Sequence, residues 1–273
     1  LLLLHGVCSG LRFLARSRFF ANQAKILSAD KVGKSGSDLA TLESVKSRSE
    51  VFFLKNGLSA PPKLTLKTMA NLATKWSWGI GMLGAKRREF GNIVGHVKGI
   101  SDTSSLGSWT AEQFDPSLDW DKIAKLKEQW GGKVILKGIL DAEDAKMALK
   151  VGADAIIVSN HGGRQLDGAL SSIRALPSIL EAVGDKIDVH LDSGIRSGQD
   201  VLKAMAMGAK GTYIGRAYIY GLGAMGEAGV TSALNIIHRE LDTTMALCGE
   251  TNVEDLGRHN LLIPEDFEGR WQE

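Results

Sequence analysis

The chain has 273 residues and a formal net charge of +2, so it is long enough for one large α/β domain or two smaller ones and gives no argument for a nucleic-acid partner. Its two cysteines, Cys8 and Cys248, lack CxxC spacing, which argues against a disulfide framework and against a zinc site. No apolar run approaches the roughly 18 residues of a membrane-spanning helix.

The N-terminal part of the chain differs in composition from the rest. Residues 1–29 contain several basic residues and no acidic residue. That composition is compatible with a targeting segment, a mitochondrial one included, but the segment opens with an apolar run where a basic region is expected. A non-native or truncated leader without a signal function is the favoured interpretation. Residues 30–56 are rich in Ser, Lys and Glu without periodicity, so we expect residues 1–55 to form an atypical leader and linker.

Residues 56–118 form a candidate connecting and covering region. Within it, residues 72–88, "LATKWSWGIGMLGAKRR", place Trp76 and Trp78 beside apolar residues and a basic cluster. Such a mixture can lie in a membrane interface. The favoured interpretation is a lid or covering loop, and contact with a membrane surface is the alternative. The location of the protein is accordingly left open between the cytoplasm and the periphery of a membrane, with the mitochondrion as a further alternative.

From residue 119 onward, β-rich apolar runs alternate with segments of helical periodicity. This alternation indicates βαβ units and a parallel sheet. Four such units suit half of an eight-fold (β/α)8 barrel of the TIM type, or a doubly wound sheet. We favour the barrel, because no GxGxxG follows a first strand and polar residues cluster at the strand ends. We expect strands at 133–139, 153–159, 186–192 and 209–215 and helices at 141–152, 171–184, 196–208 and 226–249. Pro177 should produce a kink or a break in the second of these helices. Together these elements would form a half barrel over residues 119–262, followed by a tail over 263–273.

The first two predicted strands end in residues suited to chemistry. Lys137 lies in an apolar strand, where its ammonium group is costly to bury unless it meets an anion or an acceptor; snorkelling at the rim is the plainer alternative. The second strand ends in "SNHGGRQLD", residues 159–167. His161 can exchange a proton near neutral pH, and Arg164 can hold a carboxylate through two hydrogen bonds. The two glycines between them let a ligand approach. We therefore expect a proton-transfer and carboxylate-binding site at this loop.

The third and fourth strands end in "DSGIR" (192–196) and "IGR" (214–216). Small residues before a helix start expose backbone N–H groups, which form an anion site, and barrel proteins often bind phosphate after their last two strands. Arg196 and Arg216 would neutralise the phosphate, and Asp192 suits a sugar or ribityl hydroxyl. The plainer alternative is a pair of glycine turns with surface arginines.

Four stretches, "LKGILDAEDA", "GADAIIVSNHGGRQLDGA", "DSGIRSGQDVLKAMAMGA" and "YIGRAYIYGL", together closely resemble the FMN-dependent α-hydroxy-acid dehydrogenase family. That family includes L-lactate dehydrogenases, glycolate oxidases and mandelate dehydrogenases. The resemblance also extends to "NGLSAPPKLTLKTMANL" and "FDPSLDWDKIAKLKEQW", and it covers roughly residues 56–262. Some members carry a membrane-binding insert in the connecting region.

The resemblance implies oxidation of a small, lactate-like L-2-hydroxy acid to the 2-oxo acid, with reduction of FMN. It makes His161 the active-site base, acting either on the hydroxyl proton or on the α-proton, and makes Arg164 the ligand of the substrate carboxylate. It places Lys137 against the N1 region of the flavin. Further FMN ligands implied by the resemblance are Ser159 and, for the ribityl phosphate, Asp192, Ser193, Gly194, Ile195, Arg196, Gly215 and Arg216.

The chain departs from the family before residue 56. Members have eight βα units and this chain shows the last four. The strand that supplies the aspartate partner of the histidine has no counterpart before Asn56, where "SVKSRSEVFFLK" stands. A catalytically impaired remnant that binds flavin or phosphate is therefore the alternative function, and another phosphate-binding barrel enzyme, such as an isomerase, is a weaker one. The electron acceptor (oxygen, quinone or cytochrome) stays open, and a homo-oligomer is the assembly that the family implies.

Overall fold

The computed structural model describes residues 2–5, 65–84, 118–166, 168–265 and 267. The chain divides into two units, one with a parallel sheet and its helices and the other with two short helices. Most of the predicted leader and linker, and the basic cluster that ends residues 72–88, lie outside the described residues.

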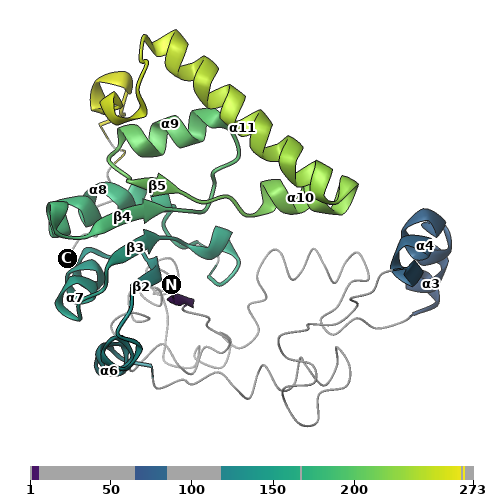
Figure 1. Ribbon diagram of the computed structural model, residues 1–273, viewed down its shortest axis with the longest axis horizontal. Coiled ribbons are helices and arrows are strands. Elements are labelled where there is room, and N and C mark those ends of the chain that lie inside the picture. Colours follow the sequence, from purple (N-terminus) through teal and green to yellow (C-terminus); the bar gives the residue numbers. More distant parts are fainter. Residues whose placement is uncertain (1, 6–64, 85–117, 167, 266, 268–273) are drawn as a thin grey trace, which may run out of the picture. The chain divides into compact units, whose positions relative to one another are not determined.

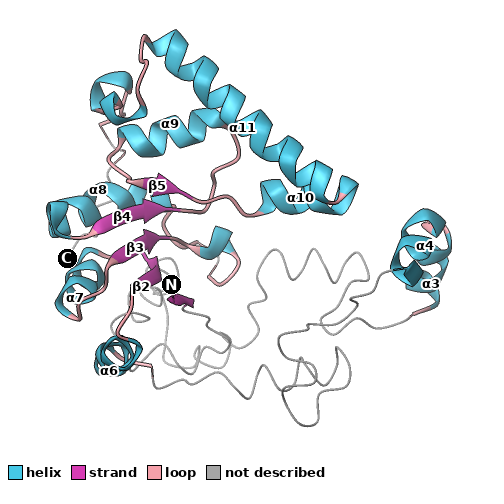
Figure 2. Cartoon of the chain, viewed as in Figure 1, coloured by secondary structure: helices cyan, strands magenta, loops and turns pink. Residues whose placement is uncertain are grey.

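Within the described part of the chain, the sheet has five parallel strands in the order β1-β2-β3-β4-β5 (Figures 1 and 2). The last four fall within the four predicted strands, which confirms the parallel βαβ organisation. The first was not predicted: it pairs with β2 from Leu2 opposite Val134 to His5 opposite Lys137. The strands are β1 (Leu2–His5), β2 (Val134–Ile139), β3 (Ala155–Val158), β4 (Asp188–Leu191) and β5 (Gly211–Thr212).

The core of this unit lies between the sheet and the helices that cover it. All four residues of β3 are buried, and Ile156 and Val158 belong to the core cluster that the strand shares with the helices. Side chains of β2 and β4 alternate in burial, and their buried members join the same cluster as the inner faces of α7 (Ala142–Lys150) and α8 (Ser172–Val183). Fully buried core side chains include Val134, Ile139, Ile156, Val158, Leu176, Ile179, Val183, Val189 and Leu191.

Several of the described α-helices begin after residues whose side chains accept hydrogen bonds from the first turn. Asp119 does so for α6 (Trp120–Trp130) and Asp141 for α7. Pro177 lies inside α8, which continues through it as one helix of 12 residues, so the predicted break is wrong. The remaining helices are α9 (Gly198–Ala206), α10 (Arg216–Met225), α11 (Glu227–Cys248), and the 3-10 turns η4 (His161–Gly163), η5 (Gly184–Lys186), η6 (Val253–Asp255) and η7 (Arg258–Asn260).

An ion cluster joins the amino ends of β2 and β3. The Asp154 carboxylate binds the ammonium groups of Lys127 and Lys133, the latter at 2.9 Å, and its Oδ2 accepts a hydrogen bond from the Val134 backbone N–H at 2.8 Å. These contacts, led by the hydrogen bonds from the two lysines, hold the pKa of Asp154 well below its ordinary value. The cluster therefore stabilises the edge of the sheet opposite to the predicted site.

The second unit contributes α3 (Leu66–Ala73) and α4 (Trp76–Gly84). Five large apolar side chains on these two helices are exposed: Leu66, Met69, Trp76, Ile80 and Leu83. Across the described residues, no helix combines the length and the apolar character needed to cross a membrane. The predicted covering region is thus helical where it is described, and it exposes five large apolar side chains.

Candidate active site

The segments that follow β2, β3 and β4 meet at the carboxyl edge of the sheet, and the start of α10 lies at the same edge (Figure 1). Side chains from the ends of β2, β3 and β4 are joined there by direct hydrogen bonds. The parallel topology produces this meeting, because all strands present their carboxyl ends at one edge. The predicted site residues are therefore brought together by the sheet itself.

A buried ion pair lies at the base of this edge. The Lys137 Nζ atom is 2.7 Å from Asp192 Oδ2, and the two side chains are only 11% and 16% exposed. Lys137 also donates a hydrogen bond to Ser159 Oγ at 3.0 Å. Burial opposes the charge on Asp192, but hydrogen bonds from Lys137, Ser159 and Ser193 outweigh it and hold the pKa of this carboxyl below its ordinary value. Lys137 is thus paired with an anion rather than snorkelling at the rim.

His161 begins the turn η4 directly after β3, with a positive φ of 55° that is uncommon for a side chain other than glycine. Three hydrogen bonds hold the turn. Its backbone N–H donates to Ser159 Oγ at 3.1 Å, and the Gly162 N–H donates at 3.0 Å both to Asn160 Oδ1 and to Ser193 Oγ. The position of the imidazole is therefore set by bonds to two neighbouring strand ends.

Gly138 gives the histidine ring its space. It interrupts the pairing of β2 with β3, where the register shifts between Lys137 and Ile139, and its φ is 106°. A Cβ atom built on Gly138 would lie 3.2 Å from His161 Cε1. The sequence prediction missed this residue, although a glycine inside a strand pattern is the usual signal of a bulge or of a close approach.

Three arginines of the predicted site have exposed side chains: Arg164, Arg196 and Arg216. Among the described residues, none of the three forms an ion pair with a carboxylate. The Arg216 guanidinium group lies against the His161 turn, since a Cβ atom on Gly162 would be 2.9 Å from one of its nitrogens. These guanidinium groups can therefore bind an anion, and Arg216 would bind it next to the histidine turn.

The expectation of free backbone amides is not met at the start of α9. The Asp200 Oδ2 atom accepts hydrogen bonds from the Arg196 and Ser197 N–H groups at 3.0 Å each, and Glu240 of α11 accepts one from the Gly198 N–H at 2.9 Å. The reason is a capping box, and its pattern, a serine followed three residues later by an acidic residue, was present in the sequence.

The start of α10 differs from the start of α9. Gly215 precedes this helix without any side-chain cap, and Arg216 is its first residue. Gly194, after β4, has a φ of 101° and open space where a side chain would be. Open glycines and an uncapped start of a ten-residue helix are the features that favour an anion. This part of the predicted phosphate site stays a prediction, and its geometry is compatible with a bound anion.

Two predicted ligands are more deeply buried than the prediction implied. Ser159 is fully buried, and its hydroxyl is engaged by Lys137 and by the His161 backbone. Ile195 belongs to the hydrophobic core, so only its backbone can face a ligand. Among the described residues, no group of three or more His, Cys, Asp or Glu side chains is placed to hold a metal ion.

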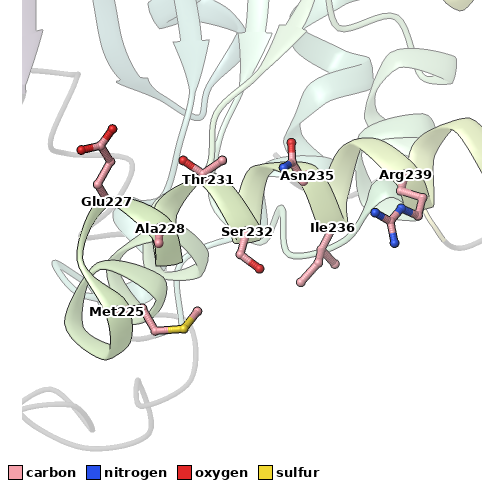
Figure 3. Close-up of a pocket in the computed structure, with 8 residues that line it drawn as sticks. All are labelled: Met225, Glu227, Ala228, Thr231, Ser232, Asn235, Ile236 and Arg239. Carbon is pink, nitrogen blue, oxygen red and sulfur yellow. The ribbon is translucent and has the colours of Figure 1, made fainter.

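Two hollows lie in the unit that contains the sheet. One, of about 720 Å³, lies along α11 next to the end of α10, and Glu227, Asn235 and Arg239 point from α11 around it (Figure 3). No predicted site residue lines it. The other, of about 540 Å³, is lined by Ser193, Gly194 and Ile195, by the charged residues Asp200 and Lys203 of α9, and by mostly apolar residues of α8 and the C-terminal segment. Only the second hollow therefore borders the predicted site.

Comparison with known proteins identifies similar sequences. The family model described as FMN-dependent dehydrogenase matches residues 45–263. An L-lactate dehydrogenase of Caulobacter vibrioides is 45% identical over 202 residues, covering 74% of this chain and 52% of the relative. An L-lactate dehydrogenase of Yersinia pestis is 43% identical over 211 residues, covering 77% and 55%. The chain thus spans about half the length of the curated relatives it matches.

Solved structures agree with these relatives. The monotopic membrane protein (S)-mandelate dehydrogenase is similar with a TM-score of 0.73 and 30% identity, covering 89% of this chain and 64% of that chain. Mandelate oxidase with (S)-4-hydroxymandelic acid is similar with a TM-score of 0.54 and 42% identity, covering 57% and 43%. Both likenesses support a fold of the TIM-barrel type, of which the chain covers a part.

Proposed function

The chain belongs to the FMN-dependent dehydrogenase family, whose fold is a TIM-type barrel, and on that premise we propose that it serves the FMN-dependent oxidation of a small, lactate-like L-2-hydroxy acid to the 2-oxo acid. The observation on which the proposal rests is the buried Lys137–Asp192 pair and its hydrogen-bonded connection to the His161 turn. A cation and a proton acceptor held at one edge of a sheet suit a reaction in which a substrate loses protons and electrons.

The residues at the carboxyl edge fit FMN. The uncapped start of α10, the open Gly194 and Gly215, and the exposed Arg216 suit a doubly charged phosphate. The ammonium group of Lys137 suits an anionic isoalloxazine edge, although it is paired with Asp192 here. When bound, FMN would supply the two-electron acceptor. The chain's own groups would hold its phosphate and place a positive charge beside its ring.

The substrate would be bound and deprotonated by the loop after β3. Arg164 is exposed there and would hold the substrate carboxylate through two parallel hydrogen bonds. His161 would accept the proton, either from the hydroxyl group or from the α-carbon, and its ring has the space that the missing side chain of Gly138 leaves. Gly163 leaves open space in η4 for a ligand, whereas the space beside Gly162 is occupied by the Arg216 guanidinium group.

The decisive experiment is a visible absorption spectrum of the purified chain with added FMN, taken before and after anaerobic L-lactate and, separately, L-mandelate. We expect bound flavin that bleaches with one of these acids. His161→Gln should bind FMN and lower the bleaching rate by about 10²-fold or more. His238→Gln, an exposed histidine on α11, is the matched control and should bleach like the wild type.

The other outcomes separate the alternatives. Flavin that binds and stays yellow with both acids would favour the remnant that binds FMN without oxidising a substrate. No bound flavin would contradict the proposal at the cofactor step. Equal bleaching rates in the wild type and His161→Gln would contradict the role of the histidine while leaving the activity intact.

For location, we propose that α3 and α4 contact a membrane surface. The five exposed apolar side chains of these helices support this, and a structural neighbour is described as a monotopic membrane protein. Sedimentation with vesicles of phosphatidylcholine and phosphatidylglycerol tests it. Leu83→Glu should release the chain, whereas Leu247→Glu, on a similarly exposed leucine of α11, should not. An unchanged vesicle-bound fraction in Leu83→Glu would favour the lid.

A further inference from the structure

The loop after β4 contains Ser193, whose backbone conformation the proposed reaction does not explain. Ser193 has a φ of 72°, the left-handed region that favours glycine, and the next residue is already a glycine. A glycine at this position would adopt the same backbone without strain. The serine side chain must therefore contribute something that offsets the unfavourable backbone.

Its hydroxyl group links two parts of the site. The Ser193 Oγ atom donates a hydrogen bond to Asp192 Oδ1 at 2.7 Å and accepts one from the Gly162 N–H at 3.0 Å. The first partner is the carboxylate that pairs with Lys137, and the second is the residue directly after His161. A single side chain thus connects the buried cation, through its anion, to the turn that holds the histidine.

The strained backbone of Ser193 is also held by a hydrogen bond from the core. Ser172, the first residue of α8 and almost fully buried, donates a hydrogen bond from its hydroxyl to the Ser193 carbonyl oxygen at 2.9 Å. This bond ties the loop to a helix of the core. Its hydroxyl also lies 3.4 Å from Ser159 Oγ, so Ser193 has a fixed support and partners on both neighbouring strand ends, as a residue needs when it acts by position.

We propose that Ser193 is a positioning residue that holds the His161 turn in register with the Lys137–Asp192 pair. The inference rests on the proposed function only in taking His161 as the base; the link itself is present without cofactor. It assigns the Ser193 hydroxyl to the histidine turn rather than to the ribityl phosphate. Without the link, the Gly162 N–H would keep Asn160 Oδ1 as its acceptor and lose the bond that crosses to the next strand.

Two substitutions separate the link from the strain. Ser193→Gly removes the hydroxyl and relieves the backbone, whereas Ser193→Ala removes the hydroxyl and keeps the strained backbone. Ser178→Ala is the control, because among the described residues the Ser178 hydroxyl bonds within α8, to the Ala175 carbonyl oxygen. If Ser193→Ala fails to fold, Ser193→Gly alone still tests the link, since glycine is the residue that this backbone favours.

The first readout is hydrogen–deuterium exchange of a peptide covering residues 159–166 in the chain without FMN. We expect Ser193→Gly to take up deuterium faster in this peptide, with the rest of the chain and the melting temperature close to the wild type. Ser178→Ala should match the wild type throughout. Equal uptake by Ser193→Gly and the wild type would overturn the proposal whether or not the chain oxidises a hydroxy acid.

The second readout is steady-state oxidation of the substrate that bleaches the flavin. We expect both Ser193 variants to lower kcat about tenfold to a hundredfold, with KM changed much less, because a small displacement of a catalytic group affects the transition state most. A turn that exchanges faster without any fall in kcat would also overturn the positioning role. A wild type without activity would contradict the proposed function, and the exchange experiment would still decide whether Ser193 holds the turn.

Discussion

The Lys137–Asp192 pair gives the sharpest prediction of stability. The two atoms are 2.7 Å apart and both side chains are largely buried, so their attraction is about 6 kcal/mol at an effective dielectric constant of about 20. Loss of hydration on burial cancels much of it, but removal of one partner leaves the other charge buried alone. We expect Asp192→Asn to lower the free energy of unfolding by about 3 kcal/mol at pH 7.

A double-mutant cycle measured by urea unfolding isolates the pair. Lys137→Met and Asp192→Asn should each destabilise the chain, and the double variant should lose less than the sum, by about 2 kcal/mol. The exposed Glu143–Lys146 pair, at 2.6 Å, is the control and should show a far smaller coupling, since solvent screens it. The depressed pKa of Asp192 adds a pH test: its contribution is present above its ordinary pKa and is lost as the pH falls through the folded value. Additive effects, or equal couplings in the two pairs, would refute the reasoning.

Three further predictions concern single residues. Gly138→Ala should destabilise the chain by about 1–2 kcal/mol and slow the reaction, because it combines a positive φ with a Cβ atom 3.2 Å from the His161 ring; unfolding curves and kcat check both effects. Asp144 is 4% exposed, and burial and the neighbouring carboxylates raise its pKa to about 7. The free energy of unfolding of the wild type should therefore fall by up to about 4 kcal/mol as the pH rises from about 4 to about 7, and Asp144→Asn should remove most of that pH dependence in urea unfolding. Asp154→Asn should lower the melting temperature at pH 7 and have little effect below the depressed pKa of Asp154, and a constant difference across pH would contradict its ionic role.

Local pattern was sufficient to predict most of the sheet. Apolar β-rich runs of the right length, followed by capping residues and helical spacing, place β2, β3 and β4 where the structure has them. Parallel pairing then brings their carboxyl ends to one edge, so Lys137, His161 and Asp192 could be expected to meet. What produced these correct predictions is a short-range signal combined with one topological rule.

Other features depend on contacts that no local pattern contains. β1 lies in a segment with the composition of a leader, and it becomes a strand only by pairing with β2, more than a hundred residues away. The expectation of free amides at α9 was wrong partly because Glu240 comes from α11. The capping box, in contrast, can be recognised in the sequence, and its presence at α9 favours the start of α10 as the anion site.

The two ends of the strands divide stability and chemistry between them. At the amino ends, Asp154 joins two lysines and a backbone N–H, and no described residue other than glycine has a positive φ there. At the carboxyl ends lie His161 and Ser193, which among the described residues are the ones other than glycine with positive φ. Such backbones persist only where surrounding bonds over-determine them, and here Ser159, Gly162 and the core supply those bonds. The strained residues therefore lie at the edge that is proposed to hold the catalytic histidine, and the core beneath this edge keeps them in place.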